Sequence, residues 1–377
     1  MKRSRLAIGL SLILAMAPTI SPAAPQCTIG ELFAGAPDYA DPAERAKDGQ
    51  GLLAVPPLGF RSLLFAGDKL VTTVRGPELW YSDLAAATPV LKRVAGRESD
   101  RRESRPGKCN DARFGNISGI ALLPDGSIAG ADQEANNLFV VSDPFGPACE
   151  VAFLAGATKP QVPLSPGTPD NVGDADGPGA RALLRGPDWV AALDDGTIYF
   201  IDTGNRKLKK ILTDPAHTVG TVATLPDGAY YAMVALNGKL YTIANNASSE
   251  GFLLEIDPGS GAVREVKRGR SDVWLGSRAI NLSGLATDGT GLFTTQSGEV
   301  LYVTPDGEVE SIAGNGTYVE FQPGYDVRQP HPAAELQLWT RPRTSTAGAN
   351  VFLAYNAGNL YLSAVGVTSY VERIACQ

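Results

Sequence analysis

Three oxygen-bearing side chains, Asn116, Asp188 and Asn281, stand where they could bind a hard cation. Each lies at the start of an apolar stretch, so the three hold equivalent places in a repeating pattern, and Arg61 and Tyr230 hold that place in other repeats. Asn and Asp oxygens that converge on one point suit calcium. The pattern therefore makes a calcium ion the candidate cofactor. The alternative, which we favour from the sequence, is a water-filled channel lined by hydrogen-bonding amides.

The residues that other common catalytic sites need do not occur together. His217 and His331, the two histidines, lie in different repeats and are too few for a three-histidine zinc site. No Gly-x-Ser-x-Gly elbow is present, and no cysteine forms a catalytic pair with a histidine. Asp170, Asp174 and Asp176 could bind calcium, but Asp and Gly at this density also simply form turns. Catalytic residues are therefore unassigned, and whether the protein is an enzyme stays open.

The elements that must position these residues are short strands in a repeated unit. Its best copy is residues 173–210, where an Asp-Gly loop leads to an apolar strand, a turn at Asp194-Asp195-Gly196 and a second strand. The sequence Asp202-Thr-Gly-Asn205-Arg206 then leads to a third strand. Period-two apolar patches bounded by Asp and Gly turns indicate antiparallel strands.

Weaker copies of this unit recur about every 40 residues, at 60–96, 117–156, 230–269 and 282–314. A last copy, 351–375, lacks its outer strand, and residues 27–35 resemble the outer strands of other copies because they also end in Ala-Gly. The spacing predicts an all-β, six-bladed β-propeller, closed by pairing of this N-terminal outer strand with the C-terminal blade. An open array, or a seven-bladed ring that uses the long loops, is the alternative.

The first 24 residues have the layout of a secretory signal peptide, with Lys2, Arg3 and Arg5, an apolar run and then small residues. Residues 25–377 are predicted to be a single propeller domain, because a closed ring of repeats forms one unit. Removing the leader takes the formal net charge from −7 to −10, which argues against nucleic acid as a partner. The apolar run is short for a bilayer. We therefore expect a secreted or periplasmic monomer without a membrane span.

The four cysteines of an exported chain allow three pairings. The repeat alignment places Cys27 beside Cys376 in the closing blade and so predicts a bridge between them. Cys109 and Cys149 are left as the second pair. Their register is difficult, because Cys109 precedes an inner strand whereas Cys149 begins an outer strand, near opposite faces of the ring.

The third repeat resembles those of the NHL-repeat β-propeller family. The matching residues are Asp176, Gly177, Ala182, Pro187, Asp194, Asp195, Gly196, Tyr199, Asp202, Asn205 and Arg206. The resemblance implies that Asp202 and Arg206 tie neighbouring blades together rather than act on a ligand. The chain is more distantly similar to gluconolactonase-like six-bladed propellers, which implies Glu, Asn and Asp metal ligands at the channel. No inner-strand Glu stands at the matching place here.

Four connections between blades are long, at residues 36–58, 97–115, 157–186 and 315–343. In a propeller they lie on one face, and long loops in compact domains usually carry function. The stretch 97–108 mixes basic with acidic residues and is predicted to be solvated. We favour a binding scaffold whose loop-rich face holds a protein, peptide, glycan or small molecule. The alternative is a metal-assisted hydrolase or lyase acting on a small molecule at the channel mouth.

Overall fold

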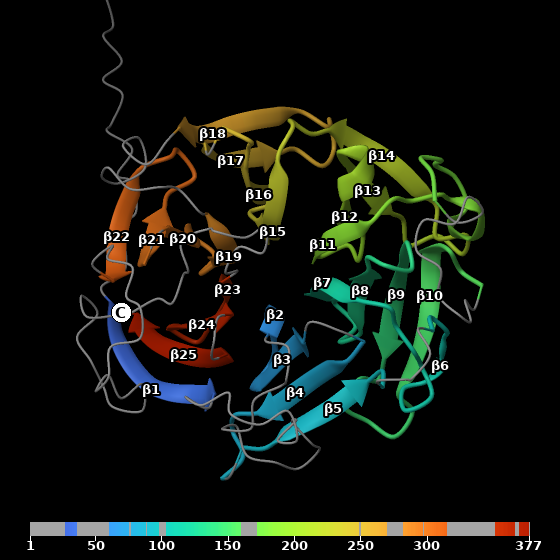
Figure 1. Cartoon of the computed structure of the whole chain (residues 1–377), viewed down its shortest axis with the longest axis horizontal. Coiled ribbons are helices and arrows are strands. Elements are labelled where there is room, and N and C mark those ends of the chain that lie inside the picture. The colour runs from blue at the N-terminus through green and yellow to red at the C-terminus, as the bar shows by residue number, and fades with distance from the viewer. Residues whose placement is uncertain are drawn as a thin grey trace, which may run out of the picture.

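The computed structural model describes residues 27–35, 60–74, 77–87, 89–97, 103–159, 172–248, 250–269, 282–296, 298–314, 351–365 and 369–376. They form six small antiparallel sheets arranged in a ring (Figure 1), so the predicted six-bladed β-propeller is confirmed. The helical elements of these residues are two 3-10 turns, η1 (Gly179–Arg181) and η2 (Thr203–Asn205). None of the helices in this part of the chain is long and apolar enough to cross a membrane.

Each sheet is one blade, and in blades 1 to 5 four strands follow chain order from the centre of the ring outward. Blade 1 contains β2 (Phe60–Ala66), β3 (Lys69–Val74), β4 (Leu79–Asp83) and β5 (Leu91–Ala95). Blade 2 contains β7 (Ile117–Leu122), β8 (Ile128–Asp132), β9 (Asn137–Ser142) and β10 (Glu150–Gly156). Blade 3 contains β11 (Pro187–Ala192), β12 (Ile198–Asp202), β13 (Lys207–Ile211) and β14 (Val219–Thr224).

The second half of the ring follows the same plan. Blade 4 contains β15 (Ala229–Leu236), β16 (Lys239–Asn245), β17 (Gly251–Ile256) and β18 (Val263–Gly269). Blade 5 contains β19 (Ser283–Thr287), β20 (Leu292–Gln296), β21 (Glu299–Val303) and β22 (Val309–Gly314). Blade 6 contains β23 (Val351–Asn356), β24 (Asn359–Val365) and β25 (Ser369–Cys376), with β1 (Cys27–Gly35) as its outer strand.

The N-terminal strand closes the ring as the sequence predicts. β1 pairs antiparallel with β25, and Figure 1 shows the two side by side although they come from opposite ends of the chain. The register places Cys27 directly opposite Cys376. The side chains of these two cysteines lie outside the described part of the structure, so the bridge between them stays a prediction. Pairing with β1 covers the edge of β25 that would otherwise be open.

Blade 2 has a fifth strand that the four-strand repeat does not predict. β6 (Gly107–Lys108) pairs with the outer strand β10 and so carries the following Cys109 to the outer edge of the blade. There Cys109 forms a disulfide with Cys149, with 5.5 Å between the two Cα atoms. The expectation of a solvated stretch at 97–108 is wrong in part, because Ser104 is completely buried. The fifth strand also resolves the register difficulty of this cysteine pair.

The hairpin turns follow from local turn chemistry. The Asp125 carboxylate accepts a hydrogen bond from the Ser127 N–H, and Asp195 accepts one from the Thr197 N–H, both at 2.9 Å. In the second turn, Gly196 lies between Asp195 and Thr197 and has a φ of +82°. Glycine adopts this conformation at little energetic cost because it has no Cβ atom. Because Asp and Gly promote such turns, the hairpins of these blades could be located from the sequence.

Candidate functional site

The inner strands β2, β7, β11, β15, β19 and β23 surround the central channel (Figure 1). All six begin at the face where the chain passes from one blade to the next, which we call the loop-rich face. They end at the opposite face, where hairpin turns join the first two strands of each blade, which we call the turn face. The starts of the inner strands therefore form the channel mouth on the loop-rich face.

Five inner strands carry a β-bulge at this mouth. The register shifts between Phe60 and Ser62, Ile117 and Ile120, Asp188 and Val190, Tyr230 and Ala232, and Ser283 and Leu285. A bulge places two residues opposite one and re-aims side chains, and it is common at barrel rims and beside active sites. Arg61 and Trp189 are the bulged residues of β2 and β11.

Arg61, Gln133 and Asp188 form a polar cluster at the mouth, from three different strands or strand ends. The Asp188 Oδ2 atom accepts hydrogen bonds from Gln133 Nε2 at 3.1 Å and from Arg61 Nη2 at 3.4 Å. Arg61 Nη2 also donates to Gln133 Oε1 at 3.2 Å. Asp188 is only 5% exposed, and this burial raises the pKa of its carboxyl, while Arg61 and the Trp189 N–H oppose the rise.

The three predicted calcium ligands have different surroundings. Asp188 is already paired with a guanidinium, which neutralises its charge. The Oδ1 atom of Asn116 is buried without a hydrogen-bond partner, while the Asn116 N–H donates to Asp132 at 2.9 Å. Asn281 lies outside the described residues. In the part of the chain that the structure describes, no three His, Cys, Asp or Glu side chains cluster as metal ligands would. The calcium site therefore stays a prediction.

Sequence reasoning missed the roles of Gln133 and Trp189. Gln133 follows the second strand of its blade, so a search of inner strands passes over it, although its place directly after Asp132 in the repeated loop was an available signal. Trp189 reads as an ordinary apolar strand residue. Only the bulge, which no pattern in the sequence marks, brings it to the channel.

Trp189 has an unusual backbone conformation, and its side chain reaches across the channel. Its φ is +35°, which for a bulky residue is strained by about 1–3 kcal/mol. Its backbone N–H donates a hydrogen bond to the carboxylate of the preceding residue, Asp188, at 2.9 Å. Its indole Nε1–H donates to the Tyr230 carbonyl at 2.7 Å. The ring centroid lies 6.0 Å from that of Phe352, on the opposite blade of the ring. The two rings therefore meet across the channel axis.

A cavity of about 310 Å³ occupies the channel. Four consecutive residues from every inner strand line it: Ser62–Phe65, Gly119–Leu122, Trp189–Ala192, Ala232–Ala235, Gly284–Thr287 and Phe352–Tyr355. None of these side chains is charged. The Arg61–Asp188 pair precedes the lining segments in the strands, so it stands on the loop-rich side of the cavity.

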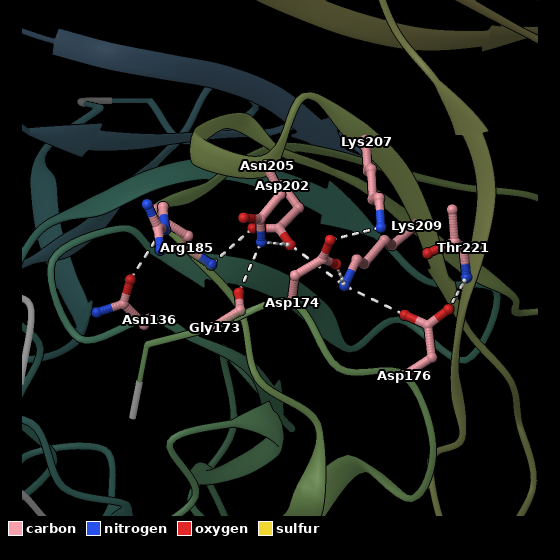
Figure 2. A network of polar contacts seen from close by, with 11 residues as sticks. Asn136, Gly173, Asp174, Asp176, Arg185, Asp202, Asn205, Lys207, Lys209 and Thr221 are labelled. Carbon is pink, nitrogen blue, oxygen red and sulfur yellow. Dashed lines mark hydrogen bonds and ion pairs between the residues drawn. The ribbon is translucent and has the colours of Figure 1, made fainter. Parts of the chain in front are cut away.

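The Asp-rich loop of blade 3 binds a lysine. Figure 2 shows Lys209 among the carboxylates of Asp174, Asp176 and Asp202, with Nζ–O distances of 3.0, 3.1 and 3.3 Å. Burial opposes the charge of Lys209, but hydrogen bonds and charge from these carboxylates raise its pKa overall. Lys207 adds a second ion pair to Asp174. Asp174 and Asp176, considered as calcium ligands, thus have ammonium groups as their partners.

The repeated Asp residues hold the entry segments of their blades. Asp202 is fully buried and accepts hydrogen bonds from the Arg185 N–H and from Asn205 Nδ2, both at 2.7 Å (Figure 2). Asp132 accepts in the same way from Gly115 and Asn116. Burial raises the pKa of both carboxyls despite these bonds.

Arg206 adopts the left-handed conformation, with a φ of +54°. It forms an exposed ion pair with Asp227, which lies in the connection to blade 4. Such exposed pairs contribute little stability. Asp202 and Arg206 thus make structural contacts within and between blades, away from the channel cavity.

The sequence matches no protein-family model and no curated protein. Similar solved structures include an aldose sugar dehydrogenase with bound PQQ from Streptomyces coelicolor (13% identity, TM-score 0.49, 95% of this chain and 100% of the other). Another is a putative gluconolactonase (12%, 0.48, 92% and 98%). A third is virginiamycin B lyase from Staphylococcus aureus (10%, 0.47, 84% and 94%). At these identities and TM-scores the similarity carries no information about activity, and the fold assignment rests on the six sheets themselves.

Proposed function

We propose that this protein is an exported binding protein that holds its ligand on the loop-rich face, over the channel mouth. The observation that carries the proposal is how the Arg61 guanidinium is bonded: one nitrogen is held in place and the other two are available to a ligand. Its Nη2 is anchored by Gln133 and Asp188, while Nε and Nη1 bond no other described residue. The side chain is 18% exposed, so it is oriented but not sealed off. A fixed guanidinium edge of this kind suits a carboxylate or carbonyl oxygen.

A peptide is the ligand class that this geometry supports best. Peptides present a terminal carboxylate and a row of carbonyl oxygens, which an arginine fork binds well. The proposal includes removal of residues 1–24 as a signal peptide and a monomeric mature chain in the secreted or periplasmic space. The disulfide between Cys109 and Cys149 is compatible with an oxidising compartment. N-terminal sequencing of the exported protein tests the cleavage position.

The experiment is selection of peptides with free C-termini from a random library on the immobilised mature chain. The selected peptides are then titrated against Arg61→Ala and against Leu212→Ser, a matched control on the turn face that replaces a 37% exposed leucine. We expect Arg61→Ala to weaken binding at least tenfold and Leu212→Ser to leave it unchanged. Peptides that lose affinity only with Leu212→Ser, or a selection that yields no saturable binder, would overturn the proposal.

A metal-assisted hydrolase or lyase is the second candidate, because the Asn116 Oδ1 atom lacks a partner beside the mouth. The pairing of Asp188 with Arg61 supports the binding proposal instead, since a cation would compete with the guanidinium. The measurement is metal content of the purified mature protein, with melting curves in the presence and absence of a chelator. Stoichiometric calcium lost together with thermal stability would favour the enzyme. A metal-free protein whose melting temperature is the same with and without the chelator would exclude that form of the enzyme hypothesis.

A further inference from the structure

We propose that the channel cavity is a second binding site, entered from the turn face, for one uncharged planar heteroaromatic ring system. It is separate from the proposed peptide site on the loop-rich face. The cavity volume of about 310 Å³ lies at the lower end of the range for small-molecule pockets. Its wall is built of short side chains at many positions, among them Gly119, Ala191 and Ala232, which leave room around the axis. The space therefore suits one compact ring system rather than an extended ligand.

The aromatic pair supplies flat contact surface inside this space. Trp189 and Phe352 both line the cavity, with their ring planes tilted by 34°. Trp189 is fixed by hydrogen bonds from both its backbone N–H and its indole N–H, so its ring is pre-positioned. Rigid aromatic side chains favour ligands with π-faces, which gain stacked or edge contacts. A strained residue held in place by its surroundings is a recognised mark of a binding site.

The wall also carries hydrogen-bonding groups from the main chain. Each inner strand pairs with the second strand of its own blade and with no other described strand, as β11 does with β12. The other edge of each inner strand therefore faces the channel, with N–H and C=O groups that have no strand partner. An aliphatic ligand would leave these groups without partners, which is costly. A charged ligand would find no opposite charge among the lining residues. A heteroaromatic ring suits both parts of the wall: its apolar faces can stack on the aromatic side chains, and the donors and acceptors on its rim can bond the main-chain groups.

The turn face provides the entrance. Leu122, at the end of β7, lines the cavity and is 38% exposed, so the cavity reaches solvent there. At the other end, the Arg61–Asp188 pair and the crossing rings of Trp189 and Phe352 stand between the cavity and the loop-rich mouth. A ligand in the cavity thus does not need the loop-rich face.

Adenine is the probe, with glucose as a polar compound that lacks an aromatic face. Binding to the mature full chain is measured by isothermal titration and by ligand-detected NMR. Phe352→Leu removes one ring, and Phe139→Leu is the matched control, because Phe139 is buried in β9, the third strand of blade 2, and packs against Phe114, and neither of these two residues lines the cavity. Unfolding curves of both variants establish that they are folded.

We expect saturable adenine binding that Phe352→Leu weakens at least tenfold and Phe139→Leu leaves unchanged. Ala235→Leu, which adds bulk to the cavity wall, should weaken binding as well. Three results would overturn the inference: no saturable adenine binding, glucose binding in preference to adenine, or equal adenine affinity in wild type and Phe352→Leu. The peptide titrations with Arg61→Ala test the loop-rich face alone, and the adenine titrations test the channel cavity alone. One proposal can therefore be refuted while the other stands.

Discussion

At the residue scale, Lys209 supplies the positive charge that a cluster of three acidic side chains needs as a counter-ion. Its side chain is completely buried, and carboxylates of the entry loop and of β12 surround its ammonium group. Asp202 is equally buried, whereas Asp174 and Asp176 reach solvent with side chains 36% and 40% exposed. The lysine therefore fastens a partly exposed loop to the interior of blade 3.

Replacing Lys209 with Met should destabilise the protein by about 3 kcal/mol, the lower end of the cost of breaking a buried ion pair. The buried Asp202 carboxylate loses its cation, while the partly exposed Asp174 and Asp176 can turn to water. Urea unfolding measures the change. Lys210→Met, on the same strand and without an assigned ion pair, should change the free energy of unfolding by less than about 0.5 kcal/mol. Equal losses in the two variants would contradict the role assigned to Lys209.

The same cluster predicts an acid-dependent loss of stability. The hydrogen bond from Lys207, with help from Lys209, holds the pKa of Asp174 below its ordinary value. Burial raises the pKa of Asp176, but bonds from Thr221 and Lys209 leave it lowered overall. A carboxyl with a lowered folded pKa stabilises above the unfolded value of about 3.9, and this stabilisation is lost as the pH falls through the folded pKa.

Asp174→Asn should therefore be less stable than wild type at pH 7 and should lose less stability between pH 4 and pH 2. The buried Asp132 and Asp202 act in the opposite direction, because their raised pKa values cost stability above the ordinary value and that cost disappears on acidification. The comparison of wild type with Asp174→Asn isolates the loop carboxyl from them. Free energies of unfolding from urea titrations at each pH provide the test, and parallel pH curves would refute the assignment.

At the scale of the elements, close contact between inner strands sets the width of the channel. Gly119 of β7 stands against β11, and a Cβ atom built on it would lie 2.6 Å from both the Trp189 Cα atom and the Val190 nitrogen. Because the obstacle is backbone, no side-chain rotation relieves it. The bulge and the glycine together bring two neighbouring blades into contact at the level of Trp189.

Gly119→Ala should therefore push β7 and β11 apart and cost about 1–3 kcal/mol, as overpacking does. Gly220→Ala in β14 is the matched control, because a Cβ atom there meets nothing within 4 Å. We expect the control to be neutral or slightly stabilising, since alanine restricts the unfolded chain. Urea midpoints compare the two. A Gly119→Ala protein as stable as wild type would show that the inner strands are less tightly packed than described.

At the scale of the whole molecule, closure joins the two ends of the chain in one blade. β1 and β25 pair over six Cα partner positions, from Cys27 opposite Cys376 to Gly35 opposite Tyr370. Among the described residues, a side-chain hydrogen bond from Asn356 Nδ2 to the Gly67 carbonyl oxygen, at 3.3 Å, also joins blade 6 to blade 1. Blade 6 is therefore the place where opening of the propeller would begin.

The predicted Cys27–Cys376 bridge should appear as one linked peptide in mass spectrometry of the unreduced, digested protein. It closes a loop from residue 27 to residue 376, so the chain-entropy model assigns it about 4–5 kcal/mol. The Cys109–Cys149 bridge closes a loop with a sequence separation of 40 and should contribute less. Double Cys→Ser variants of each pair, compared by thermal unfolding, measure the difference. Free thiols at Cys27 and Cys376 would rule the bridge out.

Local patterns were sufficient for the fold. Asp-Gly turns, period-two strands and the Ala-Gly endings located the blades and the closing strand, because hairpins form between residues close in sequence and carry their own turn signals. The fifth strand β6 was missed because it lies outside the four-strand repeat. The second disulfide could be assigned by elimination, but its register could not, since that register depends on β6.

The sequence by itself determined the blade count, the closure of the ring and the equivalence of the residues that begin the inner strands. Only the tertiary structure decided which of these residues meet. It paired Asp188 with Arg61 and Gln133, turned Trp189 toward Phe352 on the opposite blade, and placed Lys209 among the loop carboxylates. The reason is that strand periodicity and turns are local, whereas bulges and contacts across the channel depend on how six sheets pack against one another.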